Sequence, residues 1–337
     1  MKNATRRRPG IRKPPVLIRK TQELIGQIER ALGARFLAYW NSHNGSVCEH
    51  DVVGLYGLLR KLGPQKHIAL FIKSSGGSGE AALRMVNLLR QFAPRLTAVI
   101  PLDCTSAATM LALGADRIQM GPLAHLSAVD TSVTHDLSPL DRDNERVSVS
   151  QDELLRVVRL WRDERRAKDT NPYAALYPHI HPLVMGAVHR ASSLSVQLCV
   201  EILSYHLADK RRARAIAERL NSGYPSHSYP ITLREARRIG LKVEPLAPGI
   251  NERLFALNEL YSVMGQYACT DFDAFNRHDH SIVNILETAG LQVFFQNDKD
   301  WHYRKEERRW VTLNDQSSWH KAEVVKGKVL TSVYHIH

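Results

Sequence analysis

Cysteine is scarce in this chain of 337 residues, and no pair of cysteines has CxxC spacing. Cys48, Cys104, Cys199 and Cys269 are scattered, which argues against a disulfide framework or a cysteine zinc site. No run of 18 or more apolar residues occurs, so we expect no membrane-spanning helix. The basic N-terminus lacks an apolar stretch, so we expect no secretory signal. These absences favour a cytoplasmic protein whose thiols stay reduced.

Several common binding and catalytic motifs are also missing. The chain has no Walker motif, no GxGxxG turn after a strand and no GxSxG elbow. Histidine pairs with HxH spacing occur three times, at His179/His181, His278/His280 and His335/His337. Alternate residues of a strand face the same way, so such a pair can share a metal. None has a third ligand at diagnostic spacing, and we therefore predict no metal site and no cofactor.

Positive charge is concentrated at one end of the chain. The formal net charge is +12, and the first 20 residues hold eight Lys or Arg and no acidic residue. This composition predicts a flexible basic arm over residues 1–20. Such an arm is either simply solvated or binds an acidic partner, a nucleic acid or an anionic membrane surface.

Residues 67–116 carry the clearest pattern, which reads as strand, glycine turn, helix, strand, small-residue turn and helix. The apolar run 67–73 predicts a strand. It ends at a turn where Gly76 and Gly77 allow positive φ and leave backbone N–H groups uncovered. Ser106 stands where the next strand gives way to a helix of small residues. Since neighbouring parallel strands end at one edge of a sheet, we expect both turns to meet there.

This arrangement suits acyl-transfer chemistry. Ser106 at a helix N-terminus lies at the positive end of the helix dipole. The N–H groups of Gly76 and Gly77 can hold an oxyanion. The alternative is that Ser106 only caps the helix, because capping serines are common. Cys104 is either a rival nucleophile or a small core residue.

Three motifs in one order carry a family resemblance. Gly76-Gly77, followed by Ser106 through Asp116, resembles the Clp/crotonase superfamily, and especially signal peptide peptidase A and the serine dehydrogenase proteinase family. The segments 126–130 and 226–231 resemble two further boxes of that proteinase family. The resemblance implies an α/β fold, a Clp/crotonase-like spiral of ββα units, and an ATP-independent serine peptidase that assembles into a homo-oligomer. It implies Ser106 as the nucleophile, with Gly76 and Gly77 forming the oxyanion hole.

Ser106 also needs a proton acceptor, and two residues in the resembling segments qualify. Asp130 is either the base or an acid that orients it, with a structural salt bridge or turn cap as the alternative. His227 titrates in the useful range, and its alternative is a loop histidine bonded to backbone. His181 and Lys168 are reserve candidates.

The chain divides at the Pro-rich segment 245–249. We predict a basic arm over 1–20, a serine peptidase domain over 21–248 and a small α+β appendage over 249–337. Polar residues 131–150 predict a loop or lid, and a basic helix follows from Ser150 to about Lys168. In the appendage we expect a helix over 251–267, a loop holding His278 and His280, and strands at 291–295, 309–313 and 328–335.

Three functions fit these patterns. The first is a peptidase that acts on a protein or peptide substrate. The second is a non-catalytic oligomeric scaffold or sensor on the same fold that binds protein or nucleic-acid partners. The third is a crotonase-like enzyme, in which Gly76 and Gly77 hold a thioester carbonyl instead.

Overall fold

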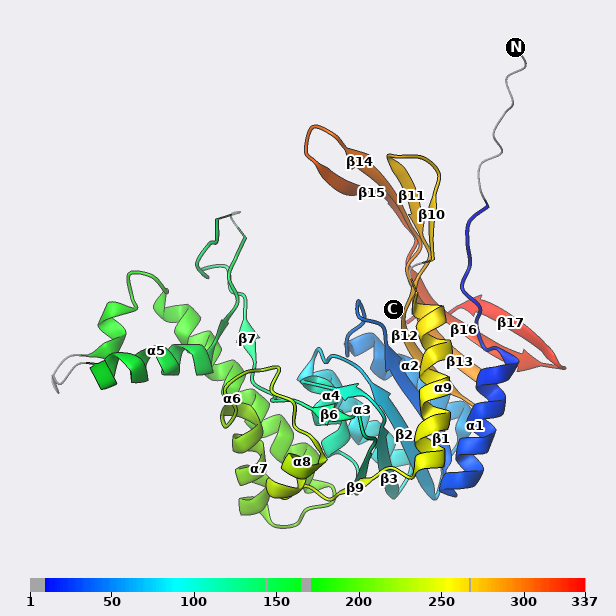
Figure 1. Ribbon diagram of the computed structural model, residues 1–337, viewed down its shortest axis with the longest axis horizontal. Helices are drawn as coiled ribbons and strands as arrows, with labels where there is room; N and C mark the ends of the chain where they lie inside the picture. The colour runs from blue at the N-terminus through cyan, green and yellow to red at the C-terminus, as the bar shows by residue number, and fades with distance from the viewer. Residues whose placement is uncertain (1–9, 143–144, 165–170, 267, 337) are drawn as a thin grey trace.

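A nine-stranded mixed sheet forms the centre of the protein, seen here in a computed structural model that describes residues 10–142, 145–164, 171–266 and 268–336 (Figure 1). One half is parallel and holds β1 (Arg35–Asn41), β2 (His67–Lys73), β3 (Arg95–Ile100), β5 (Arg117–Met120) and β9 (Val243–Pro245). The other half is antiparallel and holds β12 (Ile282–Thr288), β13 (Leu291–Gln296), β16 (Ser318–Val325) and β17 (Lys328–Val333). The halves meet where β1 pairs in parallel with β2 and antiparallel with β12.

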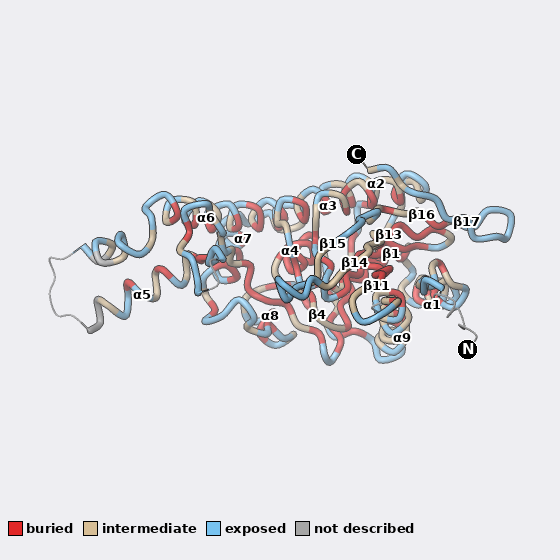
Figure 2. The backbone as a smooth tube through the Cα atoms, turned by 90° about the horizontal axis from the view of Figure 1, so that it is seen from above, coloured by how far each residue is buried: buried red, intermediate tan, exposed pale blue. Residues whose placement is uncertain are grey.

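Helices cover both faces of this sheet, and each face has its own core. Leu37 and Tyr39 of β1 belong to the core beneath α2 (Glu49–Leu62), α3 (Gly79–Phe92) and α4 (Ala107–Leu113). Phe36, Ala38 and Trp40 belong to the core beneath α1 (Arg19–Leu32) and α9 (Pro248–Gly265). The alternation follows from the two-residue period of a strand. Burial on both faces explains why the strands read as continuous apolar runs (Figure 2).

A helical region extends from the parallel half. It holds α5 (Gln151–Glu164), α6 (Pro182–Ser204), α7 (Lys210–Ser222) and α8 (Leu233–Arg238). Asp209 is the N-cap of α7. Its carboxylate accepts hydrogen bonds from two N–H groups of the first turn, so α7 begins as a new helix after α6. The expected loop 131–150 contains the short pair β7 (Ser132–Val133) and β8 (Val149–Ser150).

By length and composition alone, α6 is long and apolar enough to cross a membrane, and the expectation that the chain has no spanning helix stays a prediction. A core helix of a soluble protein can pass the same test, although only 33% of the apolar window of α6 is buried. The buried residues form one stripe along α6, and the helix packs against α3, α4 and α7.

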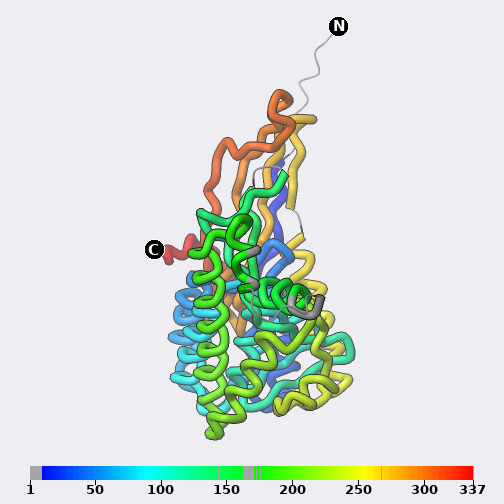
Figure 3. The backbone as a smooth tube through the Cα atoms, turned by 90° about the vertical axis from the view of Figure 1, so that its left-hand side faces the viewer, coloured from blue at the N-terminus to red at the C-terminus, as the bar shows by residue number. Residues whose placement is uncertain are grey.

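Four further strands form an arm that projects from the antiparallel half. These are β10 (Cys269–Asp271), β11 (Asn276–Asp279), β14 (Lys299–Arg304) and β15 (Arg309–Asp315). Figures 1 and 3 both show the arm extending away from the central sheet. The predicted strands near 291, 309 and 328 are present as β13, β15 and β17. The predicted loop at His278 is wrong, because His278 lies in β11.

The region after residue 248 shares the central sheet with the region before it. Asn284 of β12 donates a hydrogen bond of 2.8 Å to the buried carboxylate of Asp51 in α2. Thr21 of α1 donates one of 2.6 Å to the buried carboxylate of Glu287. The division at 249 stays a prediction, and these bonds show that the two parts have a common interior.

The predicted arm over residues 1–20 is only partly described, because residues 1–9 lie outside the described part of the chain. Within that part, the backbone N–H of Arg12 donates to Thr270 Oγ1 at 2.9 Å. Leu17 is buried, and its N–H donates to Gln292 Oε1 at 2.9 Å. Residues 12–17 therefore lie against the C-terminal region, and α1 begins at Arg19.

Candidate functional site

The two turns of the 67–116 segment meet at one place. Ser106 is partly buried, and it has φ 54° and ψ −124°. Gly76 and Gly77 have φ values of 106° and 143°. A Cβ atom added to Gly76 would lie 2.5 Å from Ser106 Cβ and 3.0 Å from its Oγ. The glycine turn is therefore pressed against the Ser106 side chain, and no larger residue fits there.

Positive φ is unfavourable for serine, so neighbouring groups must hold the Ser106 turn in place. The Ser106 N–H donates to Ser127 Oγ at 2.8 Å. The Ser127 N–H donates to Thr109 Oγ1 at 3.1 Å, and the Thr109 hydroxyl donates to the carbonyl of Cys104 at 2.8 Å. The Thr105 N–H donates to the carbonyl of Ser74 at 3.0 Å, which ties the serine turn to the end of β2.

Sequence reasoning missed Ser127 and Thr109 as supports of this turn. Ser127 lies in a segment that the resemblance singled out for Asp130 alone, and Thr109 looked like one more small residue of α4.

Backbone strain of the kind seen at Ser106 is concentrated at functional sites in proteins. A non-glycine residue with positive φ leaves no sign in a sequence.

The Ser106 hydroxyl makes no capping hydrogen bond to α4, although Ser106 occupies the N-cap position. Cys104 is fully buried, its thiol donates to the carbonyl of Ala108, and burial raises the pKa of that thiol well above its usual value. A thiol that stays protonated is a poor nucleophile. Cys104 is accordingly a core residue in this structure.

The glycine turn and the start of α4, which meet at Ser106, both carry backbone N–H groups. The Gly76 N–H donates to Ser74 Oγ at 3.2 Å. Within the described residues, the N–H groups of Gly77 and Ala107 have no acceptor. Ala107 is the first residue of α4, where helix geometry leaves N–H groups unpaired.

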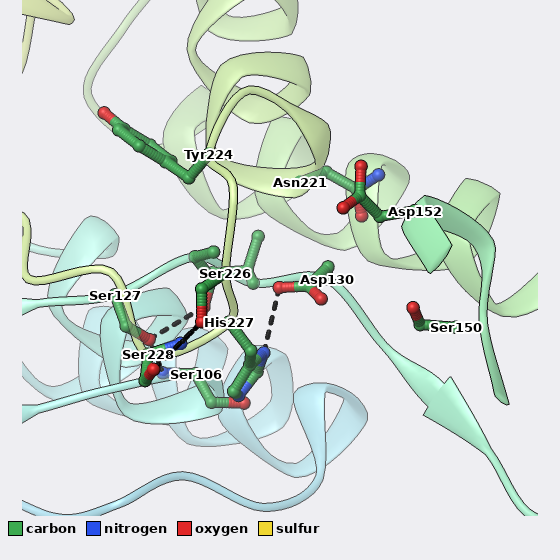
Figure 4. A network of polar contacts seen from close by, with 12 residues as sticks. Ser106, Ser127, Asp130, Ser150, Asp152, Asn221, Tyr224, Ser226, His227 and Ser228 are labelled. Carbon is green, nitrogen blue, oxygen red and sulfur yellow. Dashed lines mark hydrogen bonds and ion pairs between the residues drawn. The ribbon is translucent and has the colours of Figure 1, made fainter. Parts of the chain in front are cut away.

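His227 and Asp130 form a hydrogen-bonded pair in which His227 Nδ1 lies 2.9 Å from Asp130 Oδ1. The Asp130 hydrogen bond is the main cause of a raised pKa for His227, and burial opposes it. The His227 side chain is 50% exposed and the Asp130 side chain 18%. In Figure 4 the imidazole extends from Asp130 toward the Ser106 hydroxyl. These two residues are 97 positions apart in the chain, and α5, α6 and α7 lie between them in sequence.

The reserve candidates for the base lie elsewhere or are not described. His181 caps α6, and its Nδ1 accepts a hydrogen bond from the Leu183 N–H at 3.2 Å. Lys168 lies outside the described residues.

A cavity of about 740 Å³ lies beside Asp130 and is bounded by α5, α6 and α7. Asp152, Ser192 and Gln197 are among its lining residues, whereas Ser106 and His227 do not line it. The cavity therefore lies next to the site at Ser106 without containing it.

The chemistry available at this site is nucleophilic. A hydroxyl, a histidine fixed by a carboxylate and free backbone donors are the groups that, acting together, attack a carbonyl and hold the resulting oxyanion in serine hydrolases. Within the described residues, the one group of three His, Cys, Asp or Glu side chains with metal-ligand spacing is His278, His280 and Asp298. That group belongs to the C-terminal region, so the Ser106 site has no metal-ligand cluster of its own.

No family model matches this sequence. Two uncharacterized proteins of Methanocaldococcus jannaschii are similar to it. The first is 25% identical over 203 residues, which are 60% of this chain and 61% of the relative. This chain therefore spans less than two thirds of that relative's length. The second is 24% identical over 259 residues, covering 72% of this chain and 77% of the relative.

Two solved structures are weakly similar. A serine-to-alanine mutant of the 1510-N membrane-bound stomatin-specific protease has a TM-score of 0.39 and 14% identity, covering 70% of this chain and 88% of that chain. ClpP1 from Listeria monocytogenes has a TM-score of 0.32 and 13% identity, covering 66% of this chain and 99% of that chain. Similarity at this level establishes neither a shared fold nor a shared activity.

Proposed function

We propose that this protein is a serine peptidase with Ser106 as its nucleophile, His227 as its general base and Asp130 as the residue that orients the imidazole. The observation that carries the proposal is the strained Ser106 turn, pressed against Gly76 and faced by the His227–Asp130 pair. A serine hydroxyl is a weak nucleophile until a base accepts its proton. His227 is neutral above its pKa and can take this role.

In the first step, Ser106 Oγ bonds to the carbonyl carbon of a peptide, and its proton passes to His227 Nε2. The imidazolium that forms is stabilised by Asp130. His227 then gives the proton to the departing amine as the C–N bond breaks, leaving an ester on Ser106. Water, deprotonated by His227, then attacks the ester carbonyl; the bond from Ser106 Oγ to carbon breaks, and His227 returns the proton to Oγ.

The oxyanion that forms in each step needs two donors. We assign them to the N–H groups of Gly77 and Ala107. The N–H of Gly76 is already bonded to Ser74 Oγ. In this proposal Gly76 instead lets the backbone of the glycine turn lie directly against the Ser106 side chain. This modifies the expectation that Gly76 and Gly77 act together as donors.

The finer features of the fold belong to the same proposal. We propose a spiral of ββα units, supported by short strands that continue the main ones. β3 leads to β4 (Asp103–Cys104) and then α4, while β5 leads to β6 (His125–Leu126), which pairs in parallel with β4.

We also propose a homo-oligomer that contacts neighbours through α5 and α6, where Val157, Leu160 and Leu183 are exposed. The substrate would be a protein or peptide, and a cytoplasmic location stays a prediction. Nothing in the comparisons supports a nucleic-acid partner.

The test is labelling of the full-length protein with a fluorophosphonate, which reacts with activated serines. We expect one labelled residue, Ser106, loss of labelling in Ser106→Ala, and unchanged labelling in Ser228→Ala, a neighbouring exposed serine. Peptide cleavage should follow the same pattern. A folded wild-type protein that neither labels nor cleaves peptides would instead support the non-catalytic scaffold.

A further inference from the structure

Two imidazoles and a carboxylate come together where the arm joins the central sheet. His278 lies in β11, His280 directly follows this strand, and Asp298 directly precedes β14 on the neighbouring chain segment. Each of the three can offer one ligand atom so that these atoms all lie within 4.8 Å of one another. The His278 and His280 side chains are buried, and neither belongs to the Ser106 site.

Two of the three distances between ligand atoms in this cluster are close to those of a tetrahedral metal site. His278 Nε2 lies 3.0 Å from His280 Nδ1 and 3.7 Å from Asp298 Oδ1. Ligand bonds of roughly 2.0–2.1 Å to zinc place neighbouring tetrahedral ligand atoms about 3.3 Å apart. Small adjustments of the side chains would therefore allow all three atoms to bind one ion.

A carboxylate contact on the far side of His278 supports the same assignment. His278 Nδ1 lies 3.0 Å from Asp300 Oδ1, so the ring nitrogen that does not face the cluster is already fixed by a carboxylate. Histidines that bind zinc characteristically donate their other N–H to a carboxylate or a carbonyl, which sets the tautomer.

We propose that His278, His280 and Asp298 bind a divalent transition-metal ion of the zinc type, with Asp300 as a positioning residue for His278. Two nitrogen ligands and one oxygen ligand suit zinc better than calcium or magnesium, which prefer oxygen. His320 and Lys13 are the other titratable groups that interact with His280. Lys13 opposes a bound cation, and the two carboxylates offset it.

The location assigns this ion a structural role. The strand pair β12–β13 of the central sheet continues into β11 and β14 of the arm, and the cluster lies at this continuation. Because His278 and His280 come from one segment and Asp298 from the other, a bound ion would join both segments. Metal binding would therefore fix the arm relative to the sheet.

The test is calorimetric titration of Zn²⁺ into the full-length protein, freed of metal by chelation and carrying no histidine tag. We expect one equivalent to bind, with at least 100-fold weaker binding in His278→Gln and Asp298→Ala. Asp300→Asn should weaken binding roughly 10- to 100-fold, as loss of a carboxylate that orients a metal-binding histidine does. His302→Ala, which changes a histidine of the same arm bonded to Asn276, should bind normally.

Cobalt provides a second readout, because its visible absorption reports the coordination geometry as well as binding. Co²⁺ in a tetrahedral site should give visible absorption bands in wild type and in His302→Ala, and none in His278→Gln. Circular dichroism of each variant without metal checks that it is folded. The proposal is overturned if folded wild type takes up no Zn²⁺, or if His278→Gln and Asp298→Ala bind as wild type does through another HxH pair.

Discussion

Two histidine–carboxylate pairs of nearly equal length lie in the two halves of this molecule. The distance is 2.9 Å between His227 and Asp130, and 3.0 Å between His278 and Asp300. The two pairs differ in which partner is the more exposed one. The His227 side chain is 50% exposed and Asp130 is 18% exposed, whereas the His278 side chain is 4% exposed and Asp300 is 42% exposed.

The difference shows that a histidine–carboxylate hydrogen bond alone does not determine whether the histidine acts as a base or as a metal ligand. In both pairs the carboxylate fixes one ring nitrogen, and the surroundings of the other nitrogen decide what the histidine can do. The other nitrogen of His227 belongs to a half-exposed side chain, and in the proposed peptidase it exchanges a proton with the substrate. The other nitrogen of His278 is hydrogen-bonded to His280 at 3.0 Å and lies 3.7 Å from Asp298, an arrangement that suits a metal ion.

The largest predicted effect separates the two pairs directly. His227→Gln should slow fluorophosphonate labelling of Ser106 by roughly 100- to 10,000-fold, the usual contribution of a general base. The same change should leave Zn²⁺ binding intact. His278→Gln should give the reverse result, with weak Zn²⁺ binding and normal labelling. Rates measured by mass spectrometry decide the matter, and equal labelling rates in both variants would refute the distinction.

A second prediction concerns the junction between the halves, where burial raises the pKa of Asp51 to about 6. The unfolded chain binds this proton less tightly, so the native state loses stability as pH rises from about 4 to 6. A shift of this size corresponds to about 3 kcal/mol at most.

Asn at position 51 cannot titrate. The free energy of unfolding of wild type should therefore fall, relative to that of Asp51→Asn, as pH rises across the same interval. Urea unfolding of both proteins at pH 4.5 and 7.5 measures the difference. Glu23→Gln, which removes an exposed carboxylate of α1, serves as the control. A stability difference that does not change with pH would contradict the assigned pKa.

Gly76→Ala should slow labelling by about 100-fold, as a misplacement of about 1 Å in a reacting group does. The new methyl group would overlap Ser106 Cβ and displace the nucleophile. Gly33→Ala is the matched control, because Gly33 also has positive φ but no atom lies within 4 Å of the added Cβ. If both variants label at the same rate, the contact between Gly76 and Ser106 does not matter for reactivity.

The smallest predicted effect is a change in the pH profile of labelling. The hydrogen bond that His227 donates to Asp130 raises the pKa of His227, so the wild-type rate should fall as pH drops through a value above 6.5. Asp130→Asn removes the charge and should move the midpoint down toward the ordinary value. A midpoint that stays in place would mean that His227 is not the titrating base.

The parallel half was the easier half to predict from the sequence. Its strands are short apolar runs separated by glycine, proline and capping residues, so β2 and the start of α4 follow from local pattern alone. In β12, by contrast, Asn284 and Glu287 are buried polar residues that interrupt the apolar run. Their partners, Asp51 and Thr21, lie more than 230 residues away, and local sequence carries no sign of them.

The candidate sites also divide into residues that local sequence predicts and residues that depend on distant contacts. Ser106, Gly76 and Gly77 were predicted from spacing within one 50-residue stretch, and His227 and Asp130 from a resemblance. The absence of a metal site was predicted because no third ligand stands at a recognisable spacing from any HxH pair. Asp298 reaches His278 through antiparallel pairing of β11 with β14, a contact that depends on the register of the arm.

The central claim is that the Ser106 turn and the glycine turn form one oxyanion-binding site. A crystal structure of the fluorophosphonate-treated protein tests it most directly. The account predicts a covalent bond from Ser106 Oγ to phosphorus, with the phosphoryl oxygen about 3 Å from the Gly77 and Ala107 nitrogens. An adduct on another residue, or a phosphoryl oxygen directed away from both nitrogens, would contradict it.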